Sequence, residues 1–221
     1  MVSIPLAVEA PDHQLEWIRP PQQARTRQTL TRLLDAAERL VAEKGFEATG
    51  IAEIAKAAGA SVGGFYRRFA DKQGLLQALH ARFCEEACAT ADVGLDPARW
   101  SSAPTSEVVR EFVAFLLRIF RQREGFFRAY QVAGFSDETV RRRTVDLHVY
   151  LHGKLAALFA ERRADITHPE PEIGAAFGLD LVLGALTQAV QLQPDTLGLA
   201  DHRLDSELPR AFLAYLGVRP D

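Results

Sequence analysis

The chain has 221 residues, 48% hydrophobic and 25% charged, with a formal net charge of −3, which suits one or two compact domains with a substantial core. Residues 1–13 lack the basic start and long apolar stretch of a signal peptide, and no apolar run approaches the roughly 20 residues that cross a bilayer. Cys84 and Cys88 cannot build a disulfide framework. We therefore expect a cytoplasmic protein.

The charge is unevenly distributed along the chain. Residues 19–72 carry ten Lys and Arg against six Asp and Glu, a net charge of +4, which leaves −7 on the remainder. A basic segment on an acidic body is typical of a protein that contacts DNA with one end. An ordinary solvated helical surface would explain the number of charges but not their placement.

Residues 1–21 contain four prolines and no sustained period, which predicts a flexible arm. Because Arg19, Arg25 and Arg27 lie at or before the first helix, this arm can reach a minor groove; a solvated tail is the alternative. The first helix is predicted over 24–44, where apolar residues share one face and Gly45 marks the end.

Residues 49–76 have the pattern of two short helices joined by a tight turn. Apolar residues at helical spacing begin at Ile51 and stop before Gly59, and Ser61 can cap the next helix by accepting hydrogen bonds from its free N–H groups. Phe65 and Phe69 are expected to face inward, whereas Val62, Gly63, Gly64, Arg67 and Arg68 are expected to face outward. Such a pair is a helix-turn-helix, and its glycines and arginines suit a helix that enters a major groove.

The run from Leu33 to Leu76, LLDAAERLVAEKGFEATGIAEIAKAAGASVGGFYRRFADKQGLL, resembles the N-terminal domain of TetR-type transcriptional regulators. The family's pattern of helix, KGF, threonine, IA, AG, S, FY, F, DK and LL occurs in order and covers about a fifth of the chain. The resemblance implies a DNA-binding domain over 22–86 and a ligand-binding and dimerisation domain over 87–221. It also implies a homodimer whose last two helices form a four-helix bundle, so that two recognition helices match palindromic operator DNA.

Individual residues of this domain have predicted contacts with DNA. Thr49 can cap the second helix or hold a phosphate, whereas Gly50 replaces the second hydroxyl residue common in the family and removes one phosphate contact. The resemblance also assigns phosphates to Tyr66 and Lys72, with a half-buried tyrosine bonded inside the protein as the alternative for Tyr66. The predicted DNA-binding residues are Thr49, Ser61, Val62, Gly63, Gly64, Tyr66, Arg67, Arg68 and Lys72. Bases would be read by Val62, by Arg67 or Arg68, or through groove shape.

The rest of the chain is predicted to be helical. Helices are expected over 71–90, 106–122, 125–134, 137–163 with Ser136 as cap, 171–192, and 204–216 ending at Gly217, with a loop over 91–104. Since strand alternation does not occur, the predicted fold is all-α, with about nine helices.

Three residues one helical turn apart, His80, Cys84 and Cys88, raise the possibility of a metal site or a thiol sensor. The sequence offers no obvious fourth ligand nearby, and buried cysteine behaves as a small hydrophobe. We therefore expect packing roles and predict neither a metal nor a cofactor.

Helix 171–192 carries two stripes with different expected roles. A stripe of small and apolar residues predicts the dimer interface, with an internal helix contact as the alternative; it comprises Gly174, Gly178, Leu181, Ala185 and Ala189. Polar residues on the opposite stripe, and on helix 137–163, predict contacts to a small hydrophobic ligand among apolar walls. The expected pocket residues are Phe112, Leu116, Phe127, Tyr130, Thr144, His148, His152, Phe177, Asp180, Thr187 and Gln191. The alternatives are that the polar groups satisfy one another, bind water or face solvent.

An enzyme is not expected, because the chain has no Gly-rich phosphate loop, nucleophile elbow or HExxH pair, and His148 and His152 lack a carboxylate at ligand spacing. We expect a one-component repressor that binds a palindromic operator as a homodimer and is released by a small hydrophobic ligand. The alternative is a helix-turn-helix binding module that acts through a protein partner or through non-specific DNA binding.

Overall fold

A computed structural model describes residues 24–134 and 137–219. Within these ranges the chain forms nine α-helices and two short 3-10 helices without any strand, which confirms the predicted all-α fold. The expected arm over 1–21 and the expected cap Ser136 lie outside the described residues.

The described residues divide into two compact units, which we treat separately. One unit combines the described chain up to Glu85 with Arg123–Thr144, and the other combines Glu86–Gln122 with the described chain from Val145 onward. The sequence alone placed residues 123–144 with the later helices, whereas in the structure they belong to the unit that contains the helix-turn-helix.

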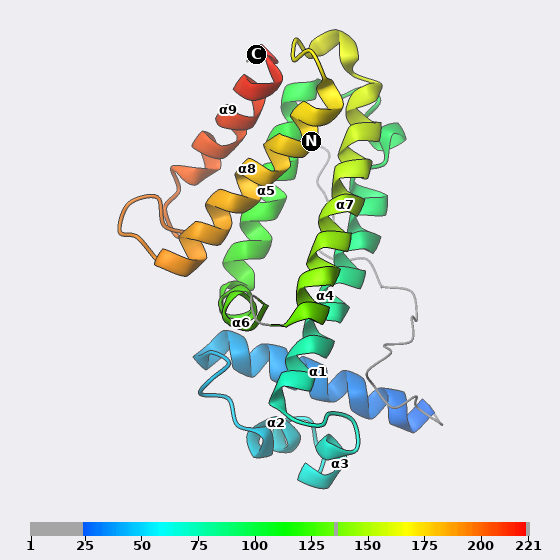
Figure 1. The fold of residues 1–221 in the computed structure, drawn as a ribbon, viewed down its shortest axis with the longest axis vertical. Helices are drawn as coiled ribbons and strands as arrows, with labels where there is room; N and C mark the ends of the chain where they lie inside the picture. The colour runs from blue at the N-terminus through cyan, green and yellow to red at the C-terminus, as the bar shows by residue number, and fades with distance from the viewer. Residues whose placement is uncertain (1–23, 135–136, 220–221) are drawn as a thin grey trace. The chain divides into compact units, whose positions relative to one another are not determined.

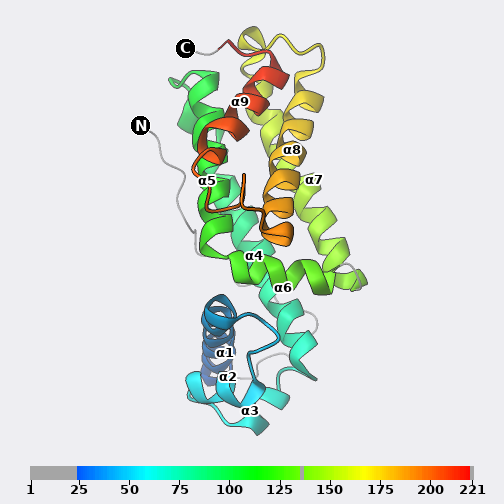
Figure 2. The ribbon, with the colours of Figure 1, turned by 90° about the vertical axis from the view of Figure 1, so that its left-hand side faces the viewer.

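The helix-turn-helix unit contains α1 (Ala24–Lys44), α2 (Ile51–Ala57), α3 (Val62–Tyr66), the first part of α4 (Lys72–Gly94) and α6 (Glu124–Gly134). Helix α1 packs against both α2 and α6 (Figure 2). Its predicted end is confirmed: Gly45 has φ +83°, a left-handed conformation that glycine adopts without strain. Phe46, which follows this turn, packs against Val41, Leu76 and Ala129.

The second unit contains the end of α4, α5 (Thr105–Gln122), most of α7 (Glu138–Ala160), α8 (Pro171–Leu192) and α9 (Leu204–Leu216). Helix α8 lies between α7 and α9, and α9 also packs on α5 (Figure 1). The bounds of α8 and α9 match the prediction, and Gly217 ends α9 with φ +68°.

The predicted bounds of two helices, α4 and α7, differ from the structure. Helix α4 continues to Gly94, whose carbonyl accepts a 2.7 Å hydrogen bond from Nε1 of the buried Trp100, and a 3-10 helix over Pro97–Trp100 occupies part of the predicted loop. Helix α7 begins after Asp137, whose carboxylate accepts from the N–H groups of Thr139 (3.0 Å) and Val140 (3.2 Å). It ends at Ala160, before a second 3-10 helix over Arg163–Asp165.

The expectation that no apolar run is long enough to cross a membrane is also wrong. Helix α8 meets that criterion by length and composition, with a mean hydropathy of 1.6 over its most apolar window. Core helices of soluble proteins meet the same criterion. In this structure one side of α8 is buried against α9, where Gly178 lies beside Phe212.

Candidate nucleic-acid interface

Helices α2 and α3 form a compact helix-turn-helix with the predicted inward face. Gly59 has φ +61° just past the end of α2, and Ser61 Oγ accepts a 3.0 Å hydrogen bond from the N–H of Gly64, as expected of a helix cap. Phe65 and Phe69 are 0% and 2% exposed, with ring centroids 5.1 Å apart, and Ala55 is 1% exposed. Burial of these side chains fixes the orientation of α3, whose opposite face points to solvent.

The open face of α3 carries most of the predicted base-reading residues. Val62 and Tyr66 are 43% and 52% exposed, Gly63 and Arg67 are also exposed, and Arg68 is half-buried. An exposed apolar side chain beside a glycine and a guanidinium provides methyl contact, close backbone approach and a cationic donor.

Gly64 does not belong to this face, contrary to the prediction. It is buried, and a Cβ at this position would lie 3.3 Å from Ser61 Oγ and 3.8 Å from the Cβ of Ala60. Gly64 therefore keeps the capping hydroxyl close to the helix and has no side chain to offer to DNA.

Thr49 is also structural where the sequence predicted a cap or a phosphate contact. It is 1% exposed, and its hydroxyl donates a 2.8 Å hydrogen bond to the carbonyl of Gly45. Gly50 stands at the N-cap of α2 without a side-chain cap. Thr49 thus stabilises the turn through an internal hydrogen bond, so its hydroxyl does not point to a phosphate. Gly50 has no hydroxyl that could replace it.

Lys72 lies at the start of α4, where the sequence predicted a phosphate contact. Its Nζ donates to the carbonyl of Glu47 at 3.1 Å and lies 4.4 Å from the centroid of the Phe46 ring. Asp71 caps α4 by accepting a 2.8 Å hydrogen bond from the N–H of Gly74. These contacts hold the ammonium group beside the turn that precedes α2.

His80 is the buried centre of a polar cluster, which comprises His80 and the half-buried Cys84, Tyr130 and Thr144. The His80 ring stacks on Tyr130 with centroids 4.4 Å apart, and its Nε2 lies 3.4 Å from Thr144 Oγ1 and 3.5 Å from Cys84 Sγ. The Tyr130 hydroxyl is hydrogen-bonded to Thr144. Here the polar groups satisfy one another, an alternative that the sequence left open.

The protonation of this cluster argues against a thiol sensor. Burial, with the charge of Arg143 as a smaller cause, lowers the pKa of His80 to about 4, and burial raises the pKa of Tyr130. A neutral imidazole cannot stabilise a neighbouring thiolate as an imidazolium does. Among the described residues no group of three or more potential ligands could hold a metal ion.

His148 and His152 acquire a carboxylate neighbour that the sequence did not reveal. Asp180 of α8 places Oδ1 2.9 Å from His152 Nε2 and 3.9 Å from His148 Nδ1. The two histidine rings lie 6.3 Å apart. A carboxylate distant in sequence thus joins the histidine pair because α7 and α8 are neighbours.

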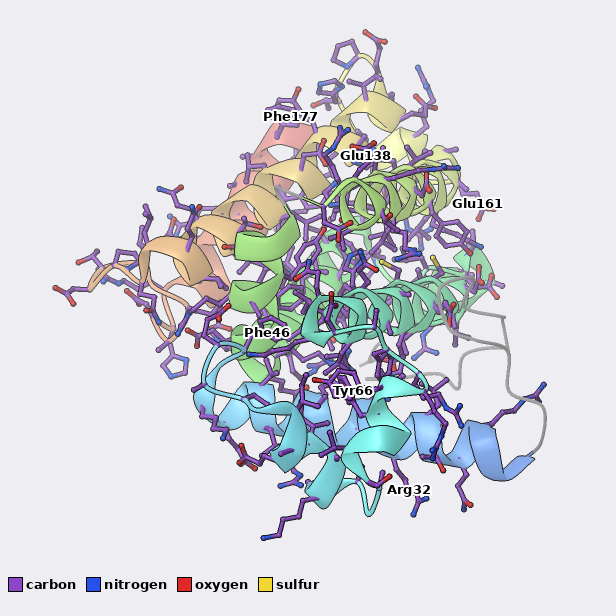
Figure 3. The ribbon with its side chains drawn as sticks, turned by 60° about the horizontal axis from the view of Figure 1, so that its bottom comes forward. Arg32, Phe46, Tyr66, Glu138, Glu161 and Phe177 are labelled. Atoms are coloured by element: carbon purple, nitrogen blue, oxygen red, sulfur yellow. The ribbon has the colours of Figure 1, made fainter. Side chains whose placement is uncertain are left out.

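The remaining expected pocket residues do not share one environment. Phe112, Leu116 and Phe127 are buried, and Thr187 is half-buried. Phe177 is 49% exposed on the outside of α8, where its ring lies 4.7 Å from Tyr215, and Gln191 is exposed as well (Figure 3). Their expected place inside a pocket is wrong, because this side of α8 is not covered by the described chain.

The small-residue stripe of α8 is largely internal. A Cβ on Gly178 would overlap the ring of Phe212, and a Cβ on Gly174 would lie 3.1 Å from Leu216 Cδ2. Ala189 is buried, whereas Leu181 and Ala185 are half-buried. For the two glycines the internal helix contact replaces the expected dimer role.

Comparisons with known proteins agree with this geometry. The family model for bacterial regulatory proteins of the tetR family matches residues 33–79. The chain is 47% identical over 53 residues to an uncharacterized HTH-type transcriptional regulator, YvkB, of Bacillus subtilis (strain 168). That match covers 24% of this chain and only 28% of YvkB.

Solved structures extend the similarity to the whole fold. A transcriptional regulator from Saccharomonospora viridis, in complex with choline, is 17% identical with a TM-score of 0.68 over 85% of this chain and 96% of its own. RolR in complex with resorcinol is 26% identical with a TM-score of 0.57 over 88% of this chain and 90% of its own. Residues 33–79 therefore match the N-terminal domain of bacterial regulatory proteins of the tetR family, and the chain has the all-α fold of solved TetR-family structures such as one from Mesorhizobium loti, which is 19% identical with a TM-score of 0.67 over 87% of this chain and 98% of its own.

Proposed function

We propose that this protein is a one-component transcriptional regulator of the cytoplasm that binds double-stranded operator DNA through α3. The observation that carries the proposal is the open face of that helix. Val62, Gly63, Tyr66 and Arg67 are exposed on a scaffold fixed by the buried Phe65 and Phe69. Such a face combines base contact with backbone proximity, as groove-reading helices do.

We also propose a homodimer, with α8 as its centre. The outer side of α8 exposes 56% of Ile173 and 49% of Phe177, next to Tyr215 of α9 at 38%. On the same side, a Cβ on Gly184 would meet nothing within 4 Å, so internal packing does not require that glycine. Exposed large apolar side chains around a small residue suit close approach of a second helix. A two-fold axis there would pair two recognition helices on a palindrome.

The small-molecule part of the proposal is that an inducer binds the helical body and releases the operator. Structural neighbours include proteins solved with choline and with resorcinol. In this chain the expected ligand contacts Phe112 and Leu116 of α5 are buried in the unit that also contains α8 and α9, and we propose a repressor whose inducer prefers the state that does not bind DNA.

Footprinting of the DNA upstream of the protein's own gene tests the proposal. We expect protection of one palindrome by the full-length protein, loss of protection in Arg67→Ala, and no loss in the control Arg142→Ala, whose residue is exposed on α7. A screen of small molecules, scored by loss of protection, would then identify the inducer. Equal protection of all sequences, or of none, would favour the alternative binding module.

A further inference from the structure

The outer side of α8 contains an ionisable cluster within its apolar surface. Asp180 is exposed on the same side as Phe177 and Gly184, which lie three and four residues away. Its carboxylate contacts His152 at 2.9 Å and His148 at 3.9 Å. We name Asp180, His148 and His152 the α7–α8 cluster.

We propose that the α7–α8 cluster makes self-association of this chain depend on pH, with the tightest association when each cluster holds one proton. The occupant of the surface is a second copy of the chain. The inference rests on the homodimer under "Proposed function" and deepens it by assigning its regulation.

A second copy fits this surface because the surface is complementary to itself. It places an acid and two bases beside exposed apolar residues, so a two-fold arrangement brings the same acid and bases from both copies to one contact. A Cβ on Gly184 would meet none of the described residues within 4 Å, so this glycine allows the close approach. Apolar neighbours at 49–65% exposure, Phe177, Val145, Ile173 and Val149, lose contact with water in the same event.

The charges of the cluster determine the dependence on pH. With both imidazoles neutral the cluster carries one negative charge from Asp180, with one proton bound it is neutral, and with two it carries one positive charge. In a symmetric dimer the two clusters carry the same net charge, so in both charged states they repel each other and lose hydration. Association should therefore weaken on both sides of an intermediate pH.

The geometry distinguishes the two histidines. His152 Nε2 makes the shorter contact with the carboxylate, at 2.9 Å. Burial lowers the pKa of His148, and the nearby His152 lowers it further, while Asp180 opposes both effects. His148 therefore becomes charged at a lower pH than an ordinary histidine does.

Charged groups on the surrounding helices have their own partners or lie farther along the helix. Lys154 and Tyr150 of α7 are both bonded to Asp92 of α4, with Lys154 Nζ 2.5 Å from Asp92 Oδ1. Glu172 of α8 lies 3.7 Å from Arg163, and on α9 Arg210 pairs with Glu207 at 2.6 Å.

On α5 Arg121 pairs with Asp205 at 2.8 Å, and Arg118 lies over the Phe115 ring. Arg142 and Asp146 are exposed on α7 before the cluster.

Sedimentation of the full-length protein between about pH 8 and pH 5 tests the proposal. We expect the dissociation constant to pass through a minimum and to rise about tenfold on each side, the repulsion of two unit charges about 10 Å apart near a protein surface. His148→Gln should remove the acid-side rise, because the second proton has no site. Asp180→Asn should remove the alkaline-side rise, because the proton-free cluster is then neutral. His202→Gln, at a side chain that is 93% exposed in another segment, should behave like the wild type.

The possible results separate this inference from the dimer on which it rests. A dimer whose dissociation constant does not change with pH, or variants with the wild-type profile, would overturn the inference and leave the dimer intact. A chain that is monomeric throughout this pH range would contradict the proposed dimer as well. Circular dichroism at each pH confirms that the variants remain folded.

Discussion

Gly178 of α8 lies directly against the ring of Phe212 of α9, so closely that a β-carbon on the glycine would overlap the ring. Phe212 is fully buried. Packing between α8 and α9 of one chain therefore requires glycine at this position. The sequence had suggested that the same glycine lies at the contact between two chains.

This contact predicts opposite effects of the same substitution at two glycines of α8. Gly178→Ala should lower the free energy of unfolding by about 1–3 kcal/mol, because α9 must move to accommodate the methyl group. In the dissociated chain, at low protein concentration, Gly184→Ala should raise it by up to about 1 kcal/mol, because the methyl group meets none of the described residues within 4 Å and alanine favours the helix. Urea denaturation of both variants measures the difference; an equal effect at the two positions would contradict the packing described here.

Lys72→Ala should weaken binding to all DNA sequences alike. We expect the ammonium group at the start of α4 to contact a phosphate, so its loss should reduce the salt dependence of the association constant by about one unit per recognition helix. Titrations of one duplex at several salt concentrations measure this slope, with Arg142→Ala as the control. A changed sequence preference at an unchanged slope would assign Lys72 to base readout.

His80 should make the protein less stable in acid. Its folded-state pKa of about 4 lies below the ordinary 6.5, so the unfolded chain takes up a proton first. The stability associated with neutral His80 is complete above pH 6.5 and is lost as the pH falls toward 4, by about 3 kcal/mol in total.

The variant His80→Gln isolates this effect. It should be less stable at neutral pH, because the stack on Tyr130 is lost, but the part of the acid dependence that His80 causes should disappear. Urea denaturation at about pH 7 and pH 4.5 compares it with wild type and with His202→Gln. Identical acid dependence in all three proteins would show that His80 is not the titrating group.

Arg121 should hold the segment between α8 and α9 in place. Its guanidinium donates to both oxygens of Asp205, at 2.8 and 3.0 Å, and to the carbonyl of Leu199 at 2.9 Å. Arg121→Ala should cost about 1–3 kcal/mol and expose residues 193–203 to proteolysis. Arg210→Ala, which removes a mostly exposed pair with Glu207, should cost less than about 1 kcal/mol. Equal proteolysis of the two variants would exclude the anchoring role.

The sequence predicted helix ends and the helix-turn-helix well because these depend on local chemistry. Glycine in a left-handed conformation ends α1 and α9, and the Ser61 hydroxyl caps α3; each is a contact within a few residues. Periodicity also identified the buried side of α3, since Phe65 and Phe69 are one turn apart.

The sequence could not determine which helix each face would meet. Small residues on α8 suit either a partner chain or α9, and only the position of Phe212 assigns Gly178 to α9. Asp180 is distant in sequence from His148 and His152, so no spacing could reveal their contact. Thr49 was misassigned because a hydroxyl just before a helix can cap that helix or donate to a carbonyl of the preceding turn. The buried hydroxyl of Thr49 donates to the carbonyl of Gly45.

Selection of duplexes from a random DNA pool by the full-length protein tests the central claim most directly. A regulator that reads DNA with the open face of α3 should enrich one two-fold symmetric sequence, and Arg67→Ala should bind the enriched duplex about 10-fold or more weakly at equal salt. Recovery of no preferred sequence, together with equal binding by wild type and Arg67→Ala, would contradict the assignment of α3 as a recognition helix.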